Sequence, residues 1–209
     1  MRHEEIVKQG LRNESMDIAI AYAKFATKLP PSKALLIELR IIYEDWKQLE
    51  KTSPDGIGID SDSPRDVLAQ ILMQNVSQND MELILDMVQE KRSPIRNAGE
   101  KALLDALAES VDLQQNLTNW VSEGACKGKL LGKIISNINL NAKTVMELVP
   151  FLKHQSAELR FACMALLNRR YLNNDQIEMY ARELLTDTEV EIRENALSVL
   201  SSLTLNDTN

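Results

Sequence analysis

The chain has 209 residues, of which 44% are hydrophobic and 26% charged, and it contains only seven Gly and six Pro. This composition fits a globular protein with a substantial core, and the scarcity of turn-forming residues argues against a fold of many short strands and favours helices. The formal net charge of −7 disfavours nucleic acid, whose binding depends on neutralising phosphates, and suits a basic protein surface.

The N-terminal residues 1–51 contain two helical patterns of apolar residues. The first occupies residues 16–29, and the second occupies residues 30–51, with Pro30 and Pro31 at its start. The apolar stripes consist of Ile18, Tyr22, Phe25 and Leu29 in the first helix and of Leu35, Leu39, Ile42, Trp46 and Leu49 in the second. Because their spacing is helical, we expect these side chains to face a core.

The chain shows no apolar segment typical of a secretory signal, and no run approaches the roughly 20 apolar residues of a membrane span. Its two cysteines, Cys126 and Cys163, have neither metal-type spacing nor a CxxC motif, which is typical of free thiols in a reducing compartment. We therefore expect a cytoplasmic protein that does not act at a membrane.

Residues 52–64 are rich in Pro, Gly, Ser and Asp, so we expect a long loop inserted between helices, within one domain. The acidic residues in and beside it are Asp55, Asp60, Asp62 and Asp66. Two interpretations stay open, a solvated loop and a contact for a basic patch on a partner. A calcium site is the least favoured interpretation, because the spacing of the acidic residues does not follow an EF-hand and Pro64 interrupts it.

One short sequence motif, the repeated phrase, recurs along the chain. In each copy a branched apolar residue directly precedes an arginine, namely Arg96, Arg160 or Arg193. These arginines are 64 and 33 residues apart, which indicates stacked repeats of about 32 residues with one degraded copy in the gap. A small residue follows each arginine three positions later, namely Gly99, Cys163 and Ala196. A small side chain there allows two helices to cross closely. Each phrase follows a shorter helical pattern, predicted at 79–90, 141–154 and 173–185, with Asn or Asp near its start as a cap.

Residues 112–138 fill the gap as a degenerate pair, with Lys127 or Gly128 where the arginine would stand. No acidic residue lies between Glu123 and Glu147. A departure from a repeat is sometimes where function lies, so one interpretation is a patch for a phosphate or an acidic partner. The alternative is a solvated basic face. The lysines of this patch are Lys127, Lys129 and Lys133.

The Ile/Leu-Arg-x-x-small phrase, after a helix that ends in paired apolar residues, resembles HEAT repeats of the armadillo-like α-solenoid superfamily. The resemblance implies an all-α, right-handed α-solenoid of about six HEAT-like helix pairs forming a single domain over residues 1–209. Its parts would be divergent N-terminal helices (1–51), the acidic loop (52–64), the repeats (65–203) and a disordered tail (204–209).

In HEAT-like stacks the second helix of each pair lines a concave binding face, so the resemblance implies the binding positions. They are Asn97, Lys101, Phe161, Asn168, Glu194 and Ser198. Phe161 suits an interface anchor, although it could instead contact the next repeat. The recurring arginines invite the idea of anion binding. Their regularity favours a structural role instead, in which each bonds a neighbouring turn or a carboxylate.

His3 and His154 are the only histidines, and the sequence shows no nucleophile–base arrangement or phosphate-binding loop. We therefore expect no enzyme activity, no cofactor and no metal. The expected function is non-catalytic binding of another protein, as an adaptor or an inhibitor, by a monomer or weak homo-oligomer. An immunity-type bacterial inhibitor that masks a basic toxin is one concrete form. The alternative is a HEAT-like alkylpurine DNA glycosylase, for which the Lys127–Lys133 segment, Trp120 and Asp112 would have to form the DNA site, although Trp120 is more typical of a core.

Overall fold

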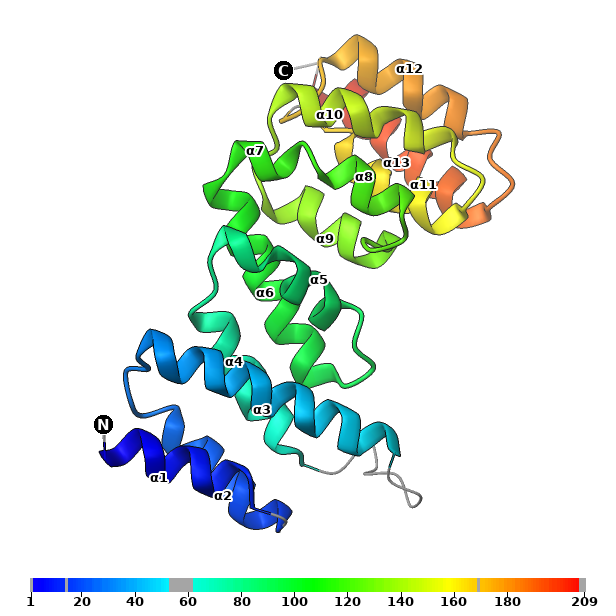
Figure 1. Cartoon of the computed structure of the whole chain (residues 1–209). Helices are drawn as coiled ribbons and strands as arrows, with labels where there is room; N and C mark the ends of the chain where they lie inside the picture. Colours follow the sequence, from blue (N-terminus) through cyan, green and yellow to red (C-terminus); the bar gives the residue numbers. More distant parts are fainter. Residues whose placement is uncertain (1, 14, 53–61, 169, 207–209) are drawn as a thin grey trace. The chain divides into compact units, whose positions relative to one another are not determined.

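The computed structural model describes residues 2–13, 15–52, 62–168 and 170–206 (Figure 1). Every regular element within these ranges is helical and none is a strand, so the predicted all-α fold class is confirmed. The chain divides into two compact units, Met1–Leu103 and Leu104–Asn209. The single continuous solenoid expected from the repeats stays a prediction.

The N-terminal unit is built on the long helix α3 (Lys33–Thr52). This helix packs against α1 (Arg2–Leu11) and α4 (Pro64–Gln74), and α2 (Met16–Ala26) packs against both α1 and α4. The unit also contains the 3₁₀ helix η1 (Gln78–Asp80), α5 (Met81–Val88) and the start of α6 (Ser93–Glu109). The core of α3 agrees with the predicted stripe, because Leu35, Leu39, Ile42 and Trp46 are all buried.

Helix α2 buries a different face from the predicted one. Its buried residues are Ala19, Ala23 and Ala26, whereas Ile18 and Phe25 are exposed. The expectation for these two side chains was therefore wrong, as it was for Leu49, which is also exposed. Small side chains let α2 approach its neighbours closely, and a stripe of large apolar residues is a poor guide to such a contact.

The C-terminal unit contains two sets of helices (Figure 1). The first helices of the repeats are α7 (Val111–Gln114) with α8 (Leu117–Ser122), then α10 (Ala142–Leu148) with the 3₁₀ helix η2 (Val149–Lys153), then α12 (Asn174–Leu184). The second helices are α9 (Gly128–Asn137), α11 (Ala157–Cys163) with η3 (Met164–Leu166), and α13 (Val190–Asn206). Helix α13 thus extends three residues into the segment where a disordered tail is predicted; residues 207–209 lie outside the described ranges.

The first two helix pairs of this unit contact each other layer by layer. Helix α8 packs against α10 and α9 against α11, while α11 also packs against η2 and α12 against α13. In these two pairs the first helices contact each other and the second helices contact each other, as in stacked helix pairs, while α12 and α13 form the third pair. The degenerate copy at 112–138 takes part in this stacking through α8 and α9.

Side-chain caps fix the starts of several helices. Asn141 accepts a hydrogen bond from the backbone N–H of Thr144, and Asn173 accepts one from Gln176, so both predicted asparagine caps are confirmed. Near residue 79 the cap is instead Ser77, which forms a capping box with Asp80. These side chains satisfy N–H groups that have no partner within the helix.

The small residue of the repeated phrase lies at a tight helix crossing. A Cβ atom placed on Gly99 would lie 2.9 Å from the backbone N of Val88 and 3.0 Å from Cβ of Met87, both in α5. Its counterparts Cys163 and Ala196 are fully buried. The close crossing predicted from the sequence is therefore confirmed at Gly99.

We expect Gly99→Ala to destabilise the protein by about 1–3 kcal/mol, because the added methyl group must push α5 away. The matched control is Gly132→Ala in α9, where the new Cβ would lie 3.7–3.8 Å from Ala162 at ordinary contact distance. There the helix-favouring effect of alanine should stabilise the protein by about 0.5–1 kcal/mol. Urea unfolding measures both, and equal stabilisation by the two substitutions would contradict the close crossing at Gly99.

Candidate functional site

The three recurring arginines make the same hydrogen bonds in their own repeats. In each, Nη1 donates to the carbonyl oxygens of the residues six and five positions earlier, in the turn between the two helices. The acceptors are Glu90 and Lys91 for Arg96, His154 and Gln155 for Arg160, and Asp187 and Thr188 for Arg193, at distances of 2.6–3.2 Å. The predicted structural role of these arginines is confirmed.

Arg160 also joins its repeat to the next one. Its Nε and Nη2 atoms each lie 2.7 Å from a carboxylate oxygen of Asp187, in the turn before α13. The hydrogen bonds from Arg160 lower the pKa of Asp187, and the backbone N–H of Glu189 adds to the effect. Because a bidentate arginine–carboxylate pair is geometrically specific, it fixes the spacing of adjacent repeats.

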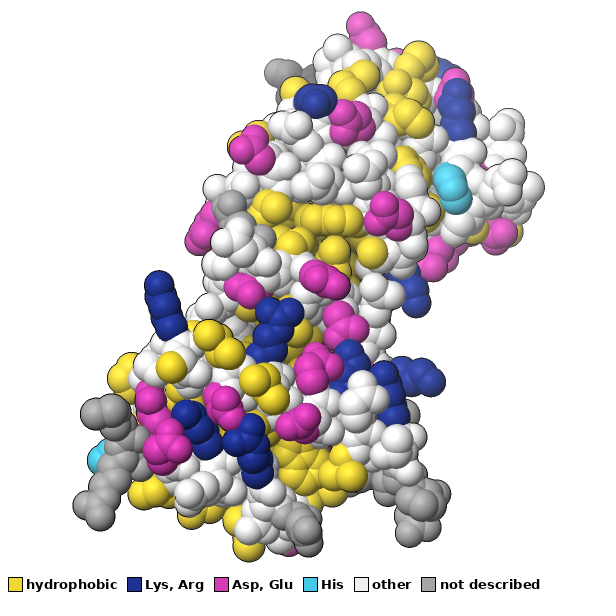
Figure 2. All heavy atoms as spheres, viewed as in Figure 1, with side chains coloured by type: hydrophobic (Ala, Val, Ile, Leu, Met, Phe, Trp, Pro, Cys, Tyr) yellow, Lys and Arg dark blue, Asp and Glu magenta, His cyan; other side chains and the backbone are white. Residues whose placement is uncertain are grey.

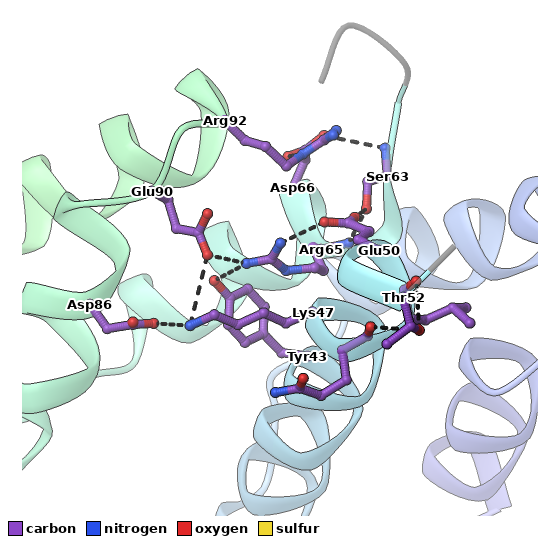
Figure 3. Close-up of polar contacts among 12 residues, drawn as sticks. Tyr43, Lys47, Glu50, Thr52, Ser63, Arg65, Asp66, Asp86, Glu90 and Arg92 are labelled. Atoms are coloured by element: carbon purple, nitrogen blue, oxygen red, sulfur yellow. Dashed lines mark hydrogen bonds and ion pairs between the residues drawn. The ribbon is translucent and has the colours of Figure 1, made fainter. Parts of the chain in front are cut away.

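In the N-terminal unit, a second charged cluster surrounds Arg65 at the start of α4 (Figure 3). Arg65 is only 3% exposed. Its Nη1 lies 2.6 Å from a carboxylate oxygen of Glu50, and its Nη2 donates to Glu90 and, at 3.0 Å, to the hydroxyl of Tyr43. The guanidinium carbon lies 4.8 Å from the centre of the Tyr43 ring, and burial raises the pKa of Tyr43.

A cavity of about 470 Å³ opens beside this cluster, but its charges are largely matched within the chain. Lys47 pairs with Asp86, and Arg92 pairs with Asp66 through two nitrogens at 2.9 and 2.6 Å. Basic and acidic side chains are interspersed over the face of this unit seen in Figure 2. We interpret the cluster as a structural network of ion pairs that holds α3, α4 and α5 together.

The predicted acidic patch is only partly described. Asp55 and Asp60 lie outside the described residues, whereas Asp62 is exposed beside α4. Asp66 belongs to the Ser63 capping box and to the pair with Arg92. The carboxylate of Asp66 is thus already used in contacts within the chain, and a partner would have to compete with them.

A different surface lies between the second helices α9 and α11. We call it the α9–α11 groove, a hollow of about 390 Å³ lined by Gly128, Lys129, Gly132, Ser136, Glu158, Phe161, Ala162 and Ala165. Small residues line its floor, since Gly132 faces Ala162. Phe161 borders this groove with 43% of its surface exposed, so it is accessible to a partner, and a contact with the next repeat stays an open alternative.

Close approach of α9 to α11 explains the glycine at the position of the missing arginine. A Cβ on Gly128 would lie 2.5 Å from Cγ of Glu158 and 2.6 Å from its carbonyl oxygen. The Glu158 carboxylate accepts the backbone N–H of Lys129 at 3.1 Å. A larger residue at position 128 would separate the two helices and remove this bond.

The groove brings together two sets of residues that the sequence suggested separately. Lys129 comes from the predicted basic patch and Phe161 from the predicted binding face, and both line the groove. Lys127 and Lys133 are exposed on the same segment. Asn168, Glu194 and Ser198 are exposed elsewhere in the C-terminal unit, and Asn97 and Lys101 are exposed in the N-terminal unit. The sequence interpretation missed Gly132 and Ala162, although the Gly-x-x-x-Gly spacing of 128 and 132 is a signal for close helix packing.

Several other candidates are core residues. Trp46 and Trp120 are buried, as expected for core tryptophans. Cys126 and Cys163 are buried free thiols, and burial raises the pKa of each to about 12. Within the described ranges no group of three or more His, Cys, Asp or Glu side chains could hold a metal ion. No described helix is both long enough and apolar enough to cross a membrane.

No protein-family model and no curated protein matches the chain. Among solved structures, the chain is similar to the crystal structure of an engineered protein, with 12% sequence identity over 98% of this chain and 97% of the other. The TM-score of that match is 0.41, so it carries no argument about fold or function.

The Arg160–Asp187 pair makes stability depend on pH. Because the pKa of Asp187 is lower in the folded protein than in the unfolded chain, its contribution is complete above about pH 4 and is lost as the pH falls through the folded pKa. We expect Asp187→Asn to cost about 1.5–3 kcal/mol near neutral pH and less in acid, as measured by urea unfolding at several pH values.

Glu183→Gln is the control for this experiment, because Glu183 pairs with Lys153 at 2.9 Å on the exposed surface. Its effect should stay below about 1 kcal/mol at every pH. A cost of Asp187→Asn that does not change with pH would show that the ionised pair with Arg160 is not what stabilises the fold.

The Arg65 cluster generates a separate prediction for stability. Arg65→Met should lower the free energy of unfolding by about 3–5 kcal/mol, because it leaves Glu50 and Glu90 without their shared cation in a largely buried place. Lys51→Met, at an exposed position beside the same cavity, should change it by no more than about 0.5 kcal/mol. Chemical denaturation distinguishes the two, and similar small effects would argue against a structural role for Arg65.

Proposed function

We propose that this chain is a non-catalytic protein-binding module made of HEAT-like helix pairs. It acts in the cytoplasm as an adaptor or an inhibitor, and it binds its partner through the exposed face of its second helices. The observation that carries the proposal is the α9–α11 groove, in which an exposed aromatic side chain borders a floor of small residues.

Phe161 is the central residue of the argument. Full burial of a phenylalanine side chain stabilises by roughly 1.5–3 kcal/mol, and a partner that covers the 43% of Phe161 that is exposed would gain the corresponding part. Aromatic side chains next to a small hollow are typical anchors of protein interfaces, because a partner can bury them and fill the hollow at once. The groove therefore suits a protein partner.

The chemistry of the described side chains supports binding over catalysis. With pKa values of about 12, the Cys126 and Cys163 thiols are protonated at neutral pH, and both are buried away from any substrate. The DNA glycosylase alternative needs an aromatic platform for a base. Trp120, the residue considered for that role, is buried in the core, which speaks against this alternative.

A photo-reactive phenylalanine analogue at position 161 tests the proposal in the cells that make the protein. We expect irradiation to give a discrete adduct with one protein. The matched control places the analogue at Met179 on the first helix α12, which is 48% exposed and so comparable to Phe161. This position should give no such adduct.

Two results would overturn the proposal. One is the absence of any discrete adduct from position 161, and the other is the same adducts in the same amounts from positions 161 and 179. Circular dichroism of both labelled proteins verifies that the analogue leaves the helical fold intact, which is expected because both positions are exposed.

A further inference from the structure

The charges around the α9–α11 groove are mainly basic. Lys129 lines the groove, and Lys127 and Lys133 are exposed on the same segment. Lys129 and Lys133 are four residues apart in α9, so they lie one turn apart on the same face of that helix. The acid that lines the groove is Glu158, and its carboxylate already accepts the backbone N–H of Lys129.

The amino-terminal end of α9 adds to this positive character. Gly128 is the first residue of the helix, and Lys127 precedes it as the N-cap residue without a capping side-chain hydrogen bond. The first turn of a helix carries a partial positive charge. The Glu158 carboxylate already accepts the N–H of Lys129 at this end, so the further attraction for negative charge comes mainly from the lysines.

The apolar part of the groove restricts what can fill it. Its volume of about 390 Å³ is near the lower end of the roughly 300–1,000 Å³ typical of small-molecule pockets. Gly132, Ala162 and Ala165 offer no side-chain hydrogen-bonding groups. The hollow therefore suits an apolar side chain that lies on these residues and against the ring of Phe161.

We propose that the α9–α11 groove binds an acidic segment of a partner protein that carries an apolar anchor residue. The anchor lies on Gly132 and Ala162 beside Phe161, and carboxylates on either side of it face Lys129 and Lys133. This inference rests on the proposed function and specifies the chemistry of the partner.

A nucleic acid is the less suitable polyanion for this site. The net charge of −7 opposes an extended chain of phosphates beyond the local patch, whereas a short acidic peptide places its charge only where the lysines are. In addition, Gly132, Ala162 and Ala165 offer no side-chain donor or acceptor to the edges of bases, which leaves Ser136 as the hydroxyl that lines the groove.

Fluorescence anisotropy with synthetic peptides tests the proposal. The probe is a fluorescein-labelled peptide of glutamates around a central Leu-Leu pair. Its comparison peptides carry Lys for every Glu or Ala for each Leu, and a labelled single-stranded oligonucleotide is tested beside them. We expect the full-length protein to bind the acidic Leu-Leu peptide best, with affinity that falls as salt rises.

Substitutions locate the binding in the groove. Phe161→Ala should weaken the acidic peptide about tenfold, because it removes the aromatic wall. Lys129→Glu combined with Lys133→Glu should weaken it at least as much and should flatten the salt dependence. Lys51→Glu combined with Lys91→Glu, an equal change of charge at two exposed lysines of the N-terminal unit, should leave the affinity unchanged. Phe161→Leu, which keeps an apolar wall, should restore part of the binding.

The inference is overturned if the basic peptide or the oligonucleotide binds as tightly as the acidic peptide. It is also overturned if Phe161→Ala and the lysine reversals have no more effect than the control that combines Lys51→Glu with Lys91→Glu. Mass spectrometry of the adduct at position 161 separates this inference from the proposed function. A mapped partner segment without acidic residues removes only the inference, whereas the absence of an adduct removes both.

Discussion

Each turn between the helices of a repeat leaves backbone carbonyl groups that the first helix cannot satisfy, and the arginine of the second helix supplies their hydrogen bonds. A guanidinium suits this task, because it has five N–H donors in a fixed plane and retains its charge. Arg160 uses one nitrogen for the carbonyls of its own turn and two for Asp187 in the following turn. The arginine therefore recurs in the three repeats whose turns it bonds, whereas the degenerate repeat at 112–138 lacks it.

The absence of this arginine helps to explain the α9–α11 groove, which lies beside the degenerate repeat. Without an arginine at the start of α9, the connection to the next repeat depends on Glu158, which bonds the backbone of Lys129. That bond requires the glycine at position 128, because any Cβ there would collide with Glu158. The resulting small residues, Gly128 beside Glu158 and Gly132 facing Ala162, line the hollow.

The sequence predicted elements whose stabilisation is local. The asparagine caps at 141 and 173 and the apolar stripe of α3 depend on residues within a few positions of each other, and periodicity identifies these directly. The face of α2 could not be predicted in this way. Its burial depends on how closely other helices approach, and alanines that permit such an approach look neutral in a search for large apolar residues.

The candidate site, too, depends on contacts between distant residues that the sequence pattern does not reveal. Phe161 and Lys129 were each identifiable from their positions in the repeats, one on the second-helix face and the other in a stretch without acids. That they line one groove depends on the distance between α9 and α11, which is set by Gly128 and Glu158 thirty residues apart. Such a contact between distant residues has no local pattern in the sequence.

The two charged regions of the molecule differ in where their counter-charges come from. Around Arg65, three acids and a tyrosine hydroxyl of the same chain surround the basic groups, so binding an external ligand would require breaking contacts that hold α3, α4 and α5 together. At the α9–α11 groove, neither Lys127 nor Lys129 forms an ion pair within the described part of the chain. An acidic partner can approach these lysines without disrupting the fold. For this reason we assign stability to the buried cluster and propose the groove as the recognition site, although both combine basic residues with a cavity.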